Sequence, residues 1–472
     1  MSRYFAVLFS DLERHSVEWS RVPRERMVSA VAEYRYLAES LSSQYGCHYR
    51  EWAGDGHMFL FESADAAVRF GLKLLESWRI ASDELAALRD VPRLGLRLGC
   101  HFGECTPLGG GGAWIGRGNA IAKRVESEAE PGSMLVSEVV LDLLDLPLYE
   151  YAPVGERSLR GDHLEKRRLY GVLAFSQELL EEKPRDELSA DDWFLRGAGL
   201  IGTVGEWSQE EADCYLEALR LRPAFAEAHN NLAAVLRALG RFGEATRHYQ
   251  EALRVRPDYP EAHYNYAALL AGRGSTGGAE EHYRQALALR PDYVDAHHGF
   301  ANLLKERGER AAAEHQYREA LRFRPDYPEV HNNLAILLEE GGDAEGARHH
   351  YSEALRLRSQ YAEAHYNFAL FLEGRGEVAG AEGHYREALR LRVDYPEAQN
   401  NLAVLLQLQG RFAEAEHHYV GALGARPDDP ETHYNYALLL RARGETAEAE
   451  RHLQLARELA PDEERFRTTV RR

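Results

Sequence analysis

Two aspartates occupy positions from which a small sheet could bring their carboxylates together. Asp11 follows an apolar run, Tyr4–Ser10, that has the pattern of a buried strand. Asp55 lies in the turn Gly54-Asp55-Gly56 between two further strand patterns, although Asp-Gly is common in hairpin turns that do no chemistry. Two hard oxygen ligands at close range suit Mg²⁺ or Mn²⁺. The pair therefore predicts a divalent-metal site if the two strands are neighbours.

The segments around the two aspartates alternate between strand and helix patterns. Strands are expected at 4–10, 49–53, 57–61 and 94–102, and helices at 24–41 and 64–78. The order β-α-β-β-α-β predicts an α+β, ferredoxin-like sheet with helices on one face. In such a sheet the first strand and the hairpin are neighbours at the centre, as the acidic pair requires.

Six motifs in residues 1–175 follow one another in the order found in a known enzyme family. They are FSDLERHS (9–16), EWAGDGHMFLF (51–61), RLGCHFGE (97–104), AEPGSMLVS (129–137), VGERSLRG (154–161) and RLYGV (168–172). In this order and spacing they resemble the catalytic domain of class III adenylate and guanylate cyclases. The fold of that family is the one that the strand and helix patterns indicate.

The resemblance implies a reaction and the residues that perform it. Asp11, Asp55 and the backbone carbonyl of Leu12 would hold two Mg²⁺ or Mn²⁺ ions. These ions activate the 3′-hydroxyl of a nucleoside triphosphate and clamp its phosphates while pyrophosphate leaves. Arg124 matches the arginine that stabilises the developing charge. In this family the metal side and the base-reading side come from opposite subunits, so the resemblance also implies a homodimer.

Three positions depart from the family's pattern. The family has asparagine four residues before the catalytic arginine, where this chain has Ala120. Asn119 is its neighbour, but one residue is about 100° of helix rotation, so Asn119 would need a register shift to serve. Glu51 stands at the base-reading position, where guanylate cyclases use a carboxylate to accept from guanine. Ala113 stands where Asp or Cys is usual, and the base therefore stays open.

The C-terminal half repeats with a period of 34 residues. Each unit has two helix patterns separated by glycine, with alanines where the two helices cross. The pattern resembles the tetratricopeptide repeat, with one weak and seven clear units over 192–461. A charged linker precedes the array at 176–191, and a charged tail follows at 462–472. Such an all-α array is expected to form a superhelix whose concave face binds another protein or peptide.

An asparagine recurs on the helix that should line this concave face. An amide donates and accepts together, so a row of amides can hold the backbone of an extended peptide. Local hydrogen bonding within the array is the alternative interpretation. The row consists of Asn231, Asn265, Asn333, Asn367, Asn401 and Asn435. The histidines that recur with the repeat, such as His229 and His263, are interpreted as structural, because equivalent residues of successive units do not surround one point.

Composition excludes several classes of protein. The formal charge of −19 argues against nucleic acid and anionic membranes as partners. The four cysteines show no CxxC spacing, which indicates reduced thiols without structural zinc. No signal peptide is recognised, and no apolar run approaches the roughly 20 residues that a membrane span needs. A cytoplasmic protein is therefore expected.

The sequence leaves three functions open. The first is a nucleotide cyclase whose repeats form a protein-binding regulatory module. The second is a catalytically degenerate, cyclase-like scaffold that works through its repeats, and Ala120 is the reason to consider it. The third is a pyrimidine cyclase that forms cCMP or cUMP in bacterial antiphage signalling, since the base-reading positions fit no standard pattern. A hydrolase is disfavoured because no nucleophile–base pair occurs at a recognisable spacing.

Overall fold

The computed structural model describes residues 3–12, 24–53, 56–89, 94–107, 114–144, 146–159, 166–175, 188–200 and 207–467. The chain divides into two compact units, Met1–Leu303 and Leu304–Arg472. The first unit contains a sheet domain and the first repeats, and the second contains the later repeats. None of the helices in the described ranges is long and apolar enough to cross a bilayer.

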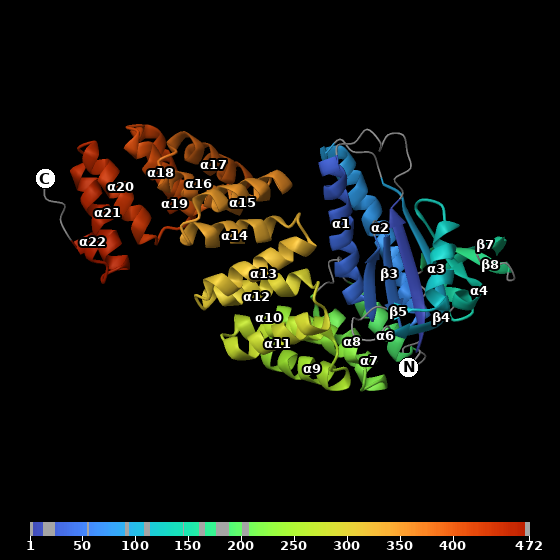
Figure 1. The fold of residues 1–472 in the computed structure, drawn as a ribbon. Coiled ribbons are helices and arrows are strands. Elements are labelled where there is room, and N and C mark those ends of the chain that lie inside the picture. The colour runs from blue at the N-terminus through green and yellow to red at the C-terminus, as the bar shows by residue number, and fades with distance from the viewer. Residues whose placement is uncertain are drawn as a thin grey trace. The chain divides into compact units, whose positions relative to one another are not determined.

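The sheet domain is built on a mixed sheet with the strand order β2-β3-β1-β4-β6-β8-β7, to which β5 is added by pairing with β4 (Figure 1). All neighbours pair antiparallel except β4 and β6, which are parallel. The strands are β1 Arg3–Leu12, β2 Tyr49–Ala53, β3 Gly56–Phe61, β4 Leu96–Pro107, β5 Trp114–Ile115, β6 Ser133–Ser137, β7 Tyr149–Ser158 and β8 Lys166–Phe175. The prediction that the first strand lies beside the hairpin is confirmed.

Helices cover both faces of this sheet, whereas the sequence pattern predicted one. Helices α1 (Arg24–Gln44) and α2 (Ala64–Arg89) lie on one side, and α3 (Arg117–Ser127) lies on the other (Figure 1). The prediction is right for α1 and α2, but α3 comes after the six elements from which it was made. Two short helices, α4 (Glu138–Leu141) and η2 (Leu146–Leu148), complete the domain.

Burial along β1 shows why the first strand reads as an unbroken apolar run. Ala6 and Leu8 lie in the core with α1 and α2, whereas Phe5 and Val7 pack in the cluster that includes Ala122 of α3. A strand covered on both faces has no solvent side, and therefore shows no alternation of polar and apolar residues. The apolar pattern of Tyr4–Ser10 thus reflects a central position in the sheet.

The repeat array consists of antiparallel helix pairs. From α8 on, the first helix of each pair is followed by a glycine with φ between 75° and 84°, a left-handed conformation that favours glycine. The first pair begins at Ala190, inside the linker expected at 176–191, because Ser189 and Asp192 form a capping box there. The helices are α6 Ala190–Gly199, α7 Gln209–Leu221, α8 Ala226–Ala238, α9 Phe242–Val255, α10 Pro260–Gly272, α11 Thr276–Leu289, α12 Val294–Glu306, α13 Arg310–Phe323, α14 Pro328–Glu340, α15 Ala344–Leu357, α16 Ala362–Gly374, α17 Val378–Leu391, α18 Pro396–Leu408, α19 Phe412–Ala425, α20 Pro430–Ala442, α21 Thr446–Leu459 and α22 Glu464–Arg467.

A recurring arginine at the end of a repeat joins it to the next repeat. The guanidinium of Arg256, the residue after α9, lies 3.5 Å from the ring centre of Tyr259 at the start of the next repeat, and its Nη1 is 2.7 Å from Oε1 of Glu227 in the first helix of its own repeat. The Arg290 guanidinium makes the same two contacts, 3.3 Å from the Tyr293 ring and 2.7 Å from Glu261. The contacts explain the periodic arginine, because each one stabilises the stacking of neighbouring repeats.

Candidate functional site

Strand pairing places Asp11 opposite the residue that follows Asp55 in the sequence. Asp11 is paired with Gly56 of β3 on one side and with Arg97 of β4 on the other. Asp55 precedes Gly56 directly, but Asp55 itself lies outside the described residues. The register therefore places Gly56 beside Asp11. That the Asp55 carboxylate lies near Asp11 stays a prediction.

Asp11 offers the chemistry of a hard metal ligand in a protected place. Its side chain is 19% exposed, so a cation can reach the carboxylate while bulk water is largely excluded. The neighbouring Leu12 is buried in the core, and only its backbone carbonyl can serve as a ligand. In this structure Nη2 of Arg97 donates to Oδ2 of Asp11. The Asp11 carboxylate and the Leu12 carbonyl are hard oxygen ligands that suit a divalent cation. For a cation to bind, the Arg97 guanidinium has to move away from Asp11.

Two glycines of β4 let α3 lie directly against the strand. A Cβ at Gly99 would stand 2.0 Å from the backbone nitrogen of Glu126, and one at Gly103 would stand 2.9 Å from Cα of Gly118. No larger residue fits at either position without moving the helix. The close approach explains the glycines of RLGCHFGE and fixes α3, which carries Asn119 and Arg124, over the end of β4.

Asn119 lies on a different side of α3 from Arg124. Its Nδ2 donates to the carbonyl oxygen of Trp114 at 2.7 Å, and its Oδ1 accepts from Sγ of Cys105 at 3.1 Å. Ala120 is exposed and Arg124 is half-buried, and these two lie four residues apart on the same face. The amide of Asn119 thus bonds to the hairpin between β4 and β5. It does not lie on the face of Arg124, because one residue is about 100° of helix rotation.

Glu51 is the base-reading candidate that the structure describes. It lies on β2 opposite Met58, its side chain is exposed, and the hydroxyl of Tyr49 donates to its Oε2 at 3.4 Å. Ala113, the second base-reading candidate, lies outside the described residues. The structure therefore gives the position of one of the two residues that were expected to select the base.

Sequence reasoning missed Arg97 and Glu126, which lie beside Asp11. Nε of Arg97 is 3.6 Å from Oε1 of Glu126, and Nζ of Lys123 is 2.8 Å from the other oxygen of that carboxylate. Burial raises the pKa of Glu126. An antiparallel register between the first and fourth strands would have indicated Arg97, because it pairs with Asp11 directly.

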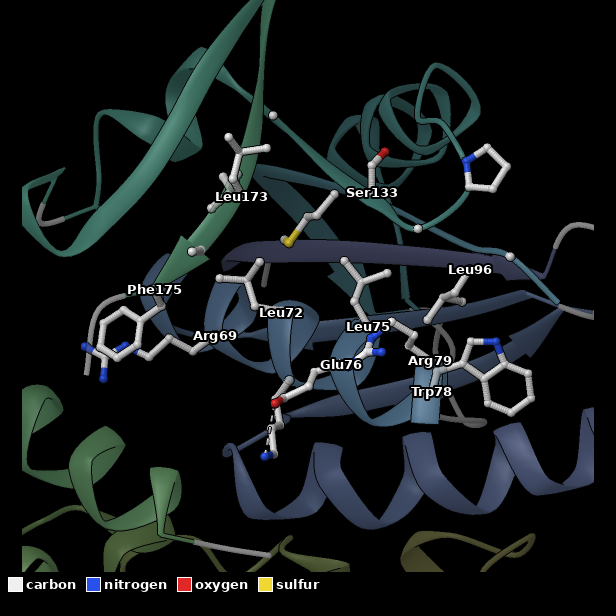
Figure 2. Close-up of a pocket in the computed structure, with 18 of the residues that line it drawn as sticks. Arg69, Leu72, Leu75, Glu76, Trp78, Arg79, Leu96, Ser133, Leu173 and Phe175 are labelled. Atoms are coloured by element: carbon white, nitrogen blue, oxygen red, sulfur yellow. Dashed lines mark hydrogen bonds and ion pairs between the residues drawn. The ribbon is translucent and has the colours of Figure 1, made fainter. Parts of the chain in front are cut away.

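A cavity of about 970 Å³ lies on the α2 side of the sheet, away from these residues. Figure 2 shows Leu72, Leu75 and Trp78 along α2, with Leu173 and Phe175 of β8 opposite them. The charges at its edge pair with one another, since Nζ of Lys73 lies 3.2 Å from Glu76. The Asp11 carboxylate and the residues around it do not line this cavity, which is chiefly apolar.

The asparagines of the array hydrogen-bond to one another across repeats. Asn265, Asn367 and Asn435 each donate from Nδ2 to an asparagine Oδ1 of the preceding repeat, at 3.0, 3.1 and 3.1 Å. Asn401 donates to the Tyr366 hydroxyl at 3.2 Å, and Oδ1 of Asn333 accepts from Asn332 at 3.4 Å. Each of these amides therefore makes at least one hydrogen bond within the array.

Asn231 bonds outside the array. Its Nδ2 donates to the backbone carbonyl of Gln44, the last residue of α1, at 2.9 Å. This carbonyl is one of those that a helix end leaves without an intrahelical partner. The first asparagine of the row thus holds a backbone oxygen of another segment, which is the kind of contact that the sequence analysis predicted for the whole row.

The recurring histidines form pairs between the two helices of a repeat. In His263 and His282 the two Nδ1 atoms are 2.9 Å apart, and Nε2 of His263 lies 3.0 Å from the carbonyl oxygen of Pro257. The same arrangement recurs in His229–His248, His331–His350, His365–His384 and His433–His452. These contacts join helix, helix and preceding turn, and they give the structural interpretation of the histidines a physical basis.

Comparison with known families and structures follows the same two-part division. The model of the adenylate and guanylate cyclase catalytic domain matches residues 2–173. Tetratricopeptide repeat models match 224–292, 270–337, 340–396 and 406–472. No curated protein matches the chain.

Solved structures resemble one part of the chain or the other. The adenylyl cyclase CyaB from P. aeruginosa is 21% identical, over 38% of this chain and 97% of its own, with a TM-score of 0.35. The guanylate cyclase domain of RhGC from Catenaria anguillulae in complex with GTP is 21% identical, over 37% and 100%, with a TM-score of 0.33. Pseudomonas aeruginosa pilF is 22% identical, over 44% and 95%, with a TM-score of 0.41. The chain joins a domain of the adenylate and guanylate cyclase catalytic family to an array of tetratricopeptide repeats.

Proposed function

We propose that this protein is a nucleotide cyclase, which converts a nucleoside triphosphate to a 3′,5′-cyclic nucleotide and pyrophosphate. The observation that carries the proposal is the position of Asp11. It is a partly exposed carboxylate at the end of the central strand, paired with the residue that follows Asp55. The match of residues 2–173 to the cyclase family supports the same reaction.

The residues of the chain have distinct roles in this reaction. Two Mg²⁺ or Mn²⁺ ions, held by Asp11, Asp55 and the Leu12 carbonyl, would supply activation of the 3′-hydroxyl and neutralisation of phosphate charge. Arg124 would stabilise the charge that develops on the phosphoryl oxygens. Its half-buried place on α3 supports this role, because part of the side chain faces solvent. A homodimer would bring the metal side of one subunit to the Arg124 side of the other.

Glu51 favours guanine as the base. An exposed carboxylate can accept hydrogen bonds from guanine, and the Tyr49 hydroxyl holds one oxygen in place. A pyrimidine cyclase remains the alternative within the same reaction class, because the unusual Ala113 removes the second polar group of a purine-reading pocket.

The repeat array would serve as the protein-binding regulatory module. The Asn231 contact with a backbone carbonyl supports peptide binding by the equivalent asparagines. The bonds between asparagines of neighbouring repeats support the purely structural alternative. Both uses are compatible for Asn367, since an amide has two N–H groups and an oxygen and its bond to Asn332 uses one of the N–H groups.

A catalytically degenerate scaffold is the second candidate function. The observation that favours it is the commitment of Asn119 to Trp114 and Cys105, which leaves the Arg124 face of α3 with Ala120 instead of an amide. In this case the sheet domain would bind nucleotide or dimerise, and the repeats would bind the partner.

One assay separates these functions. Purified full-length protein is incubated with ATP, GTP, CTP or UTP and Mn²⁺, and the products are separated by chromatography and identified by mass. We expect one cyclic nucleotide, with GTP as the leading substrate, and at least about 100-fold less product from the Asp11→Asn variant. Absence of any cyclic product, while a known cyclase is active in the same buffer, would leave the scaffold.

A further inference from the structure

Four charged side chains form a row across three elements beside the predicted metal site. Asp11 at the end of β1 accepts from Nη2 of Arg97 on β4. Nε of the same guanidinium lies 3.6 Å from Oε1 of Glu126 on α3, and Oε2 of Glu126 lies 2.8 Å from Nζ of Lys123. The signs alternate along the row, and Arg97 stands between two carboxylates.

Arg97 hydrogen-bonds to only one of these two carboxylates. Its Nε and the Oε1 of Glu126 are both buried, and neither has a hydrogen-bond partner among the described residues. A separation of 3.6 Å is too long for a hydrogen bond, yet a guanidinium shift of under about 1 Å would make one. The buried oxygen of Glu126 is therefore a ready second acceptor for Arg97.

The two carboxylates differ in what can reach them. Asp11 is 19% exposed and stands at the open end of a strand, whereas the side chain of Glu126 is only 1% exposed. Backbone packing at Gly99 holds Glu126 in place, because α3 touches β4 there without an intervening side chain. A cation from solvent can reach Asp11. Among the described residues, Arg97 and Lys123 are the basic side chains that lie within 4 Å of the Glu126 carboxylate.

A divalent cation and the Arg97 guanidinium cannot share Asp11 favourably. Both are positive, and at a separation of a few ångströms their repulsion in a half-buried site is of the order of kilocalories per mole. The buried acceptor on Glu126 gives the displaced guanidinium a place that costs little movement. The geometry thus provides two positions for one cationic side chain, and metal occupancy would select between them.

We propose that Arg97 is a positioning residue that holds Asp11 when no metal is bound and moves its guanidinium onto Glu126 when a divalent cation binds Asp11. The inference rests on the proposed function, since it takes Asp11 as a metal ligand. It also connects the metal site to α3, because Glu126 lies two residues from Arg124 on the same helix.

Binding of Mn²⁺ alone to full-length protein tests the proposal without any measurement of catalysis. Free Mn²⁺ is followed by its electron paramagnetic resonance signal during titration. Arg97→Gln removes the competitor for Asp11, so the Kd should fall by about threefold to fivefold, the size of a partly exposed ion pair. Glu126→Gln removes the second position of the guanidinium, so the Kd should rise by a similar factor. Arg168→Gln is the matched control and should not change the Kd, because it breaks only an exposed ion pair between Arg168 of β8 and Glu138 of α4.

The double variant decides whether Glu126 acts through Arg97. If it does, Arg97→Gln with Glu126→Gln should bind Mn²⁺ within about twofold of Arg97→Gln alone, because residues coupled through a shared partner are not additive. A Kd that rises or stays constant in Arg97→Gln overturns the proposal. The proposal is also overturned if Glu126→Gln raises the Kd for Mn²⁺ by the same factor in the unaltered protein and in the Arg97→Gln variant. Should Arg97→Gln fail to fold by circular dichroism, Arg97→Met takes its place as a second uncharged side chain, and its Kd should also fall.

Asp11→Asn separates failure of this proposal from failure of the proposed function. If Mn²⁺ binding by the unaltered protein does not depend on Asp11, the metal site itself is wrong, and both proposals fail. If binding depends on Asp11 but is unaffected by Arg97→Gln, only the role of Arg97 fails.

Discussion

The sheet domain and the repeat array use glycine for opposite physical reasons. In β4, a Cβ at Gly99 would stand 2.0 Å from the backbone nitrogen of Glu126, so glycine is needed for space. In the array, a Cβ at Gly376 would have no atom within 4 Å, but its φ of 75° makes glycine the favoured residue. Gly99 thus reports a tertiary contact made once, and Gly376 reports a local turn that recurs in the array from Gly240 to Gly444.

The same difference holds for polar groups. Asp11, Arg97 and Glu126 form a set of contacts that occurs once in the described residues of the sheet domain. The histidine pairs, the asparagine bonds and the stacked arginines of the array each occur several times. We therefore expect single substitutions in the sheet domain to have large effects and single substitutions in the array to have small ones.

The largest effect should come from the carboxylate at the end of β1. Asp11→Asn keeps the size of the side chain but removes the charge that two metal ions need, so turnover should fall by about 100-fold or more. Turnover is measured as cyclic nucleotide formed per minute with saturating Mn²⁺. Asp142→Asn, an exposed aspartate after α4, is the matched control and should keep full activity. Equal turnover in Asp11→Asn would contradict the metal-binding role.

Next in size is the comparison between the two kinds of glycine. Gly99→Ala should push α3 off β4 and destabilise the sheet domain by about 3 kcal/mol. Gly376→Ala strains one turn and should cost about 1 kcal/mol. Hydrogen exchange resolves the two effects, with lost protection expected across Arg117–Ser127 in the first variant and only around the turn between α16 and α17 in the second. If both substitutions caused equal losses of protection confined to the mutated residue's neighbours, the two glycines would not differ in the way proposed.

Acid should weaken the array through its histidine pairs. Burial lowers the pKa of His248 to about 4 and that of His350 to about 4, and two protonated rings cannot share an Nδ1–Nδ1 hydrogen bond. Because the folded pKa lies below the unfolded value of about 6.5, the stabilisation is complete above that pH and is lost as the pH falls toward 4. Each pair should contribute about 0.5 to 1 kcal/mol after allowance for partial exposure.

Thermal melting between pH 7 and pH 4 measures this loss. Replacing the second histidine of each pair by glutamine, the residue that the chain itself has at Gln316, should flatten the dependence of the melting temperature on pH. Those histidines are His248, His282, His350, His384 and His452. A residual slope is expected from His57 and His101 of the sheet domain, since burial lowers the pKa of both. An unchanged slope in the glutamine variant would mean that the pairs do not respond to acid.

The periodic part of the chain was the easier to predict, because each repeat supplies another copy of the same pattern. The sequence showed the helix pairs and the recurring arginine, but not that Arg256 binds Glu227 of its own repeat and stacks on Tyr259 of the next one. That contact depends on how one repeat stacks on the next. The spacing of residues along the chain does not predict this stacking.

In the sheet domain the predictable part was the first four strands and the position of the first strand beside the hairpin. The contacts of Asp11 with Arg97, and of Asn119 with Cys105, depend on strand register and on how closely α3 approaches β4. Apolar patterning determines which face a residue occupies but not its partner 86 residues away, so these contacts could not be predicted from it.

Removal of two asparagine side chains tests the array as a binding surface. Asn333→Ala with Asn367→Ala should weaken binding of a partner peptide by about 1 kcal/mol for each amide. It should also remove the bond from Asn367 to Asn332, which is one of several such bonds, so the melting temperature should change little. The partner is first captured by crosslinking to the full-length protein, and its affinity is then measured by calorimetry. Gln454→Ala, on the exposed side of α21, is the control. Full affinity with a lowered melting temperature would assign the asparagines to the stability of the array alone.

The smallest effect should be a gain in stability. Gly383 lies inside α17 with no atom within 4 Å of a Cβ placed on it, and its backbone is helical, so neither space nor conformation calls for glycine. Gly383→Ala should therefore stabilise the array by about 0.5 to 1 kcal/mol, because alanine loses less backbone freedom on folding and favours the helix. A rise in the melting temperature checks it. The repeat needs glycine at Gly376, where φ is positive, but not at Gly383. A fall in melting temperature would show that glycine at Gly383 serves a contact that the repeat pattern does not explain.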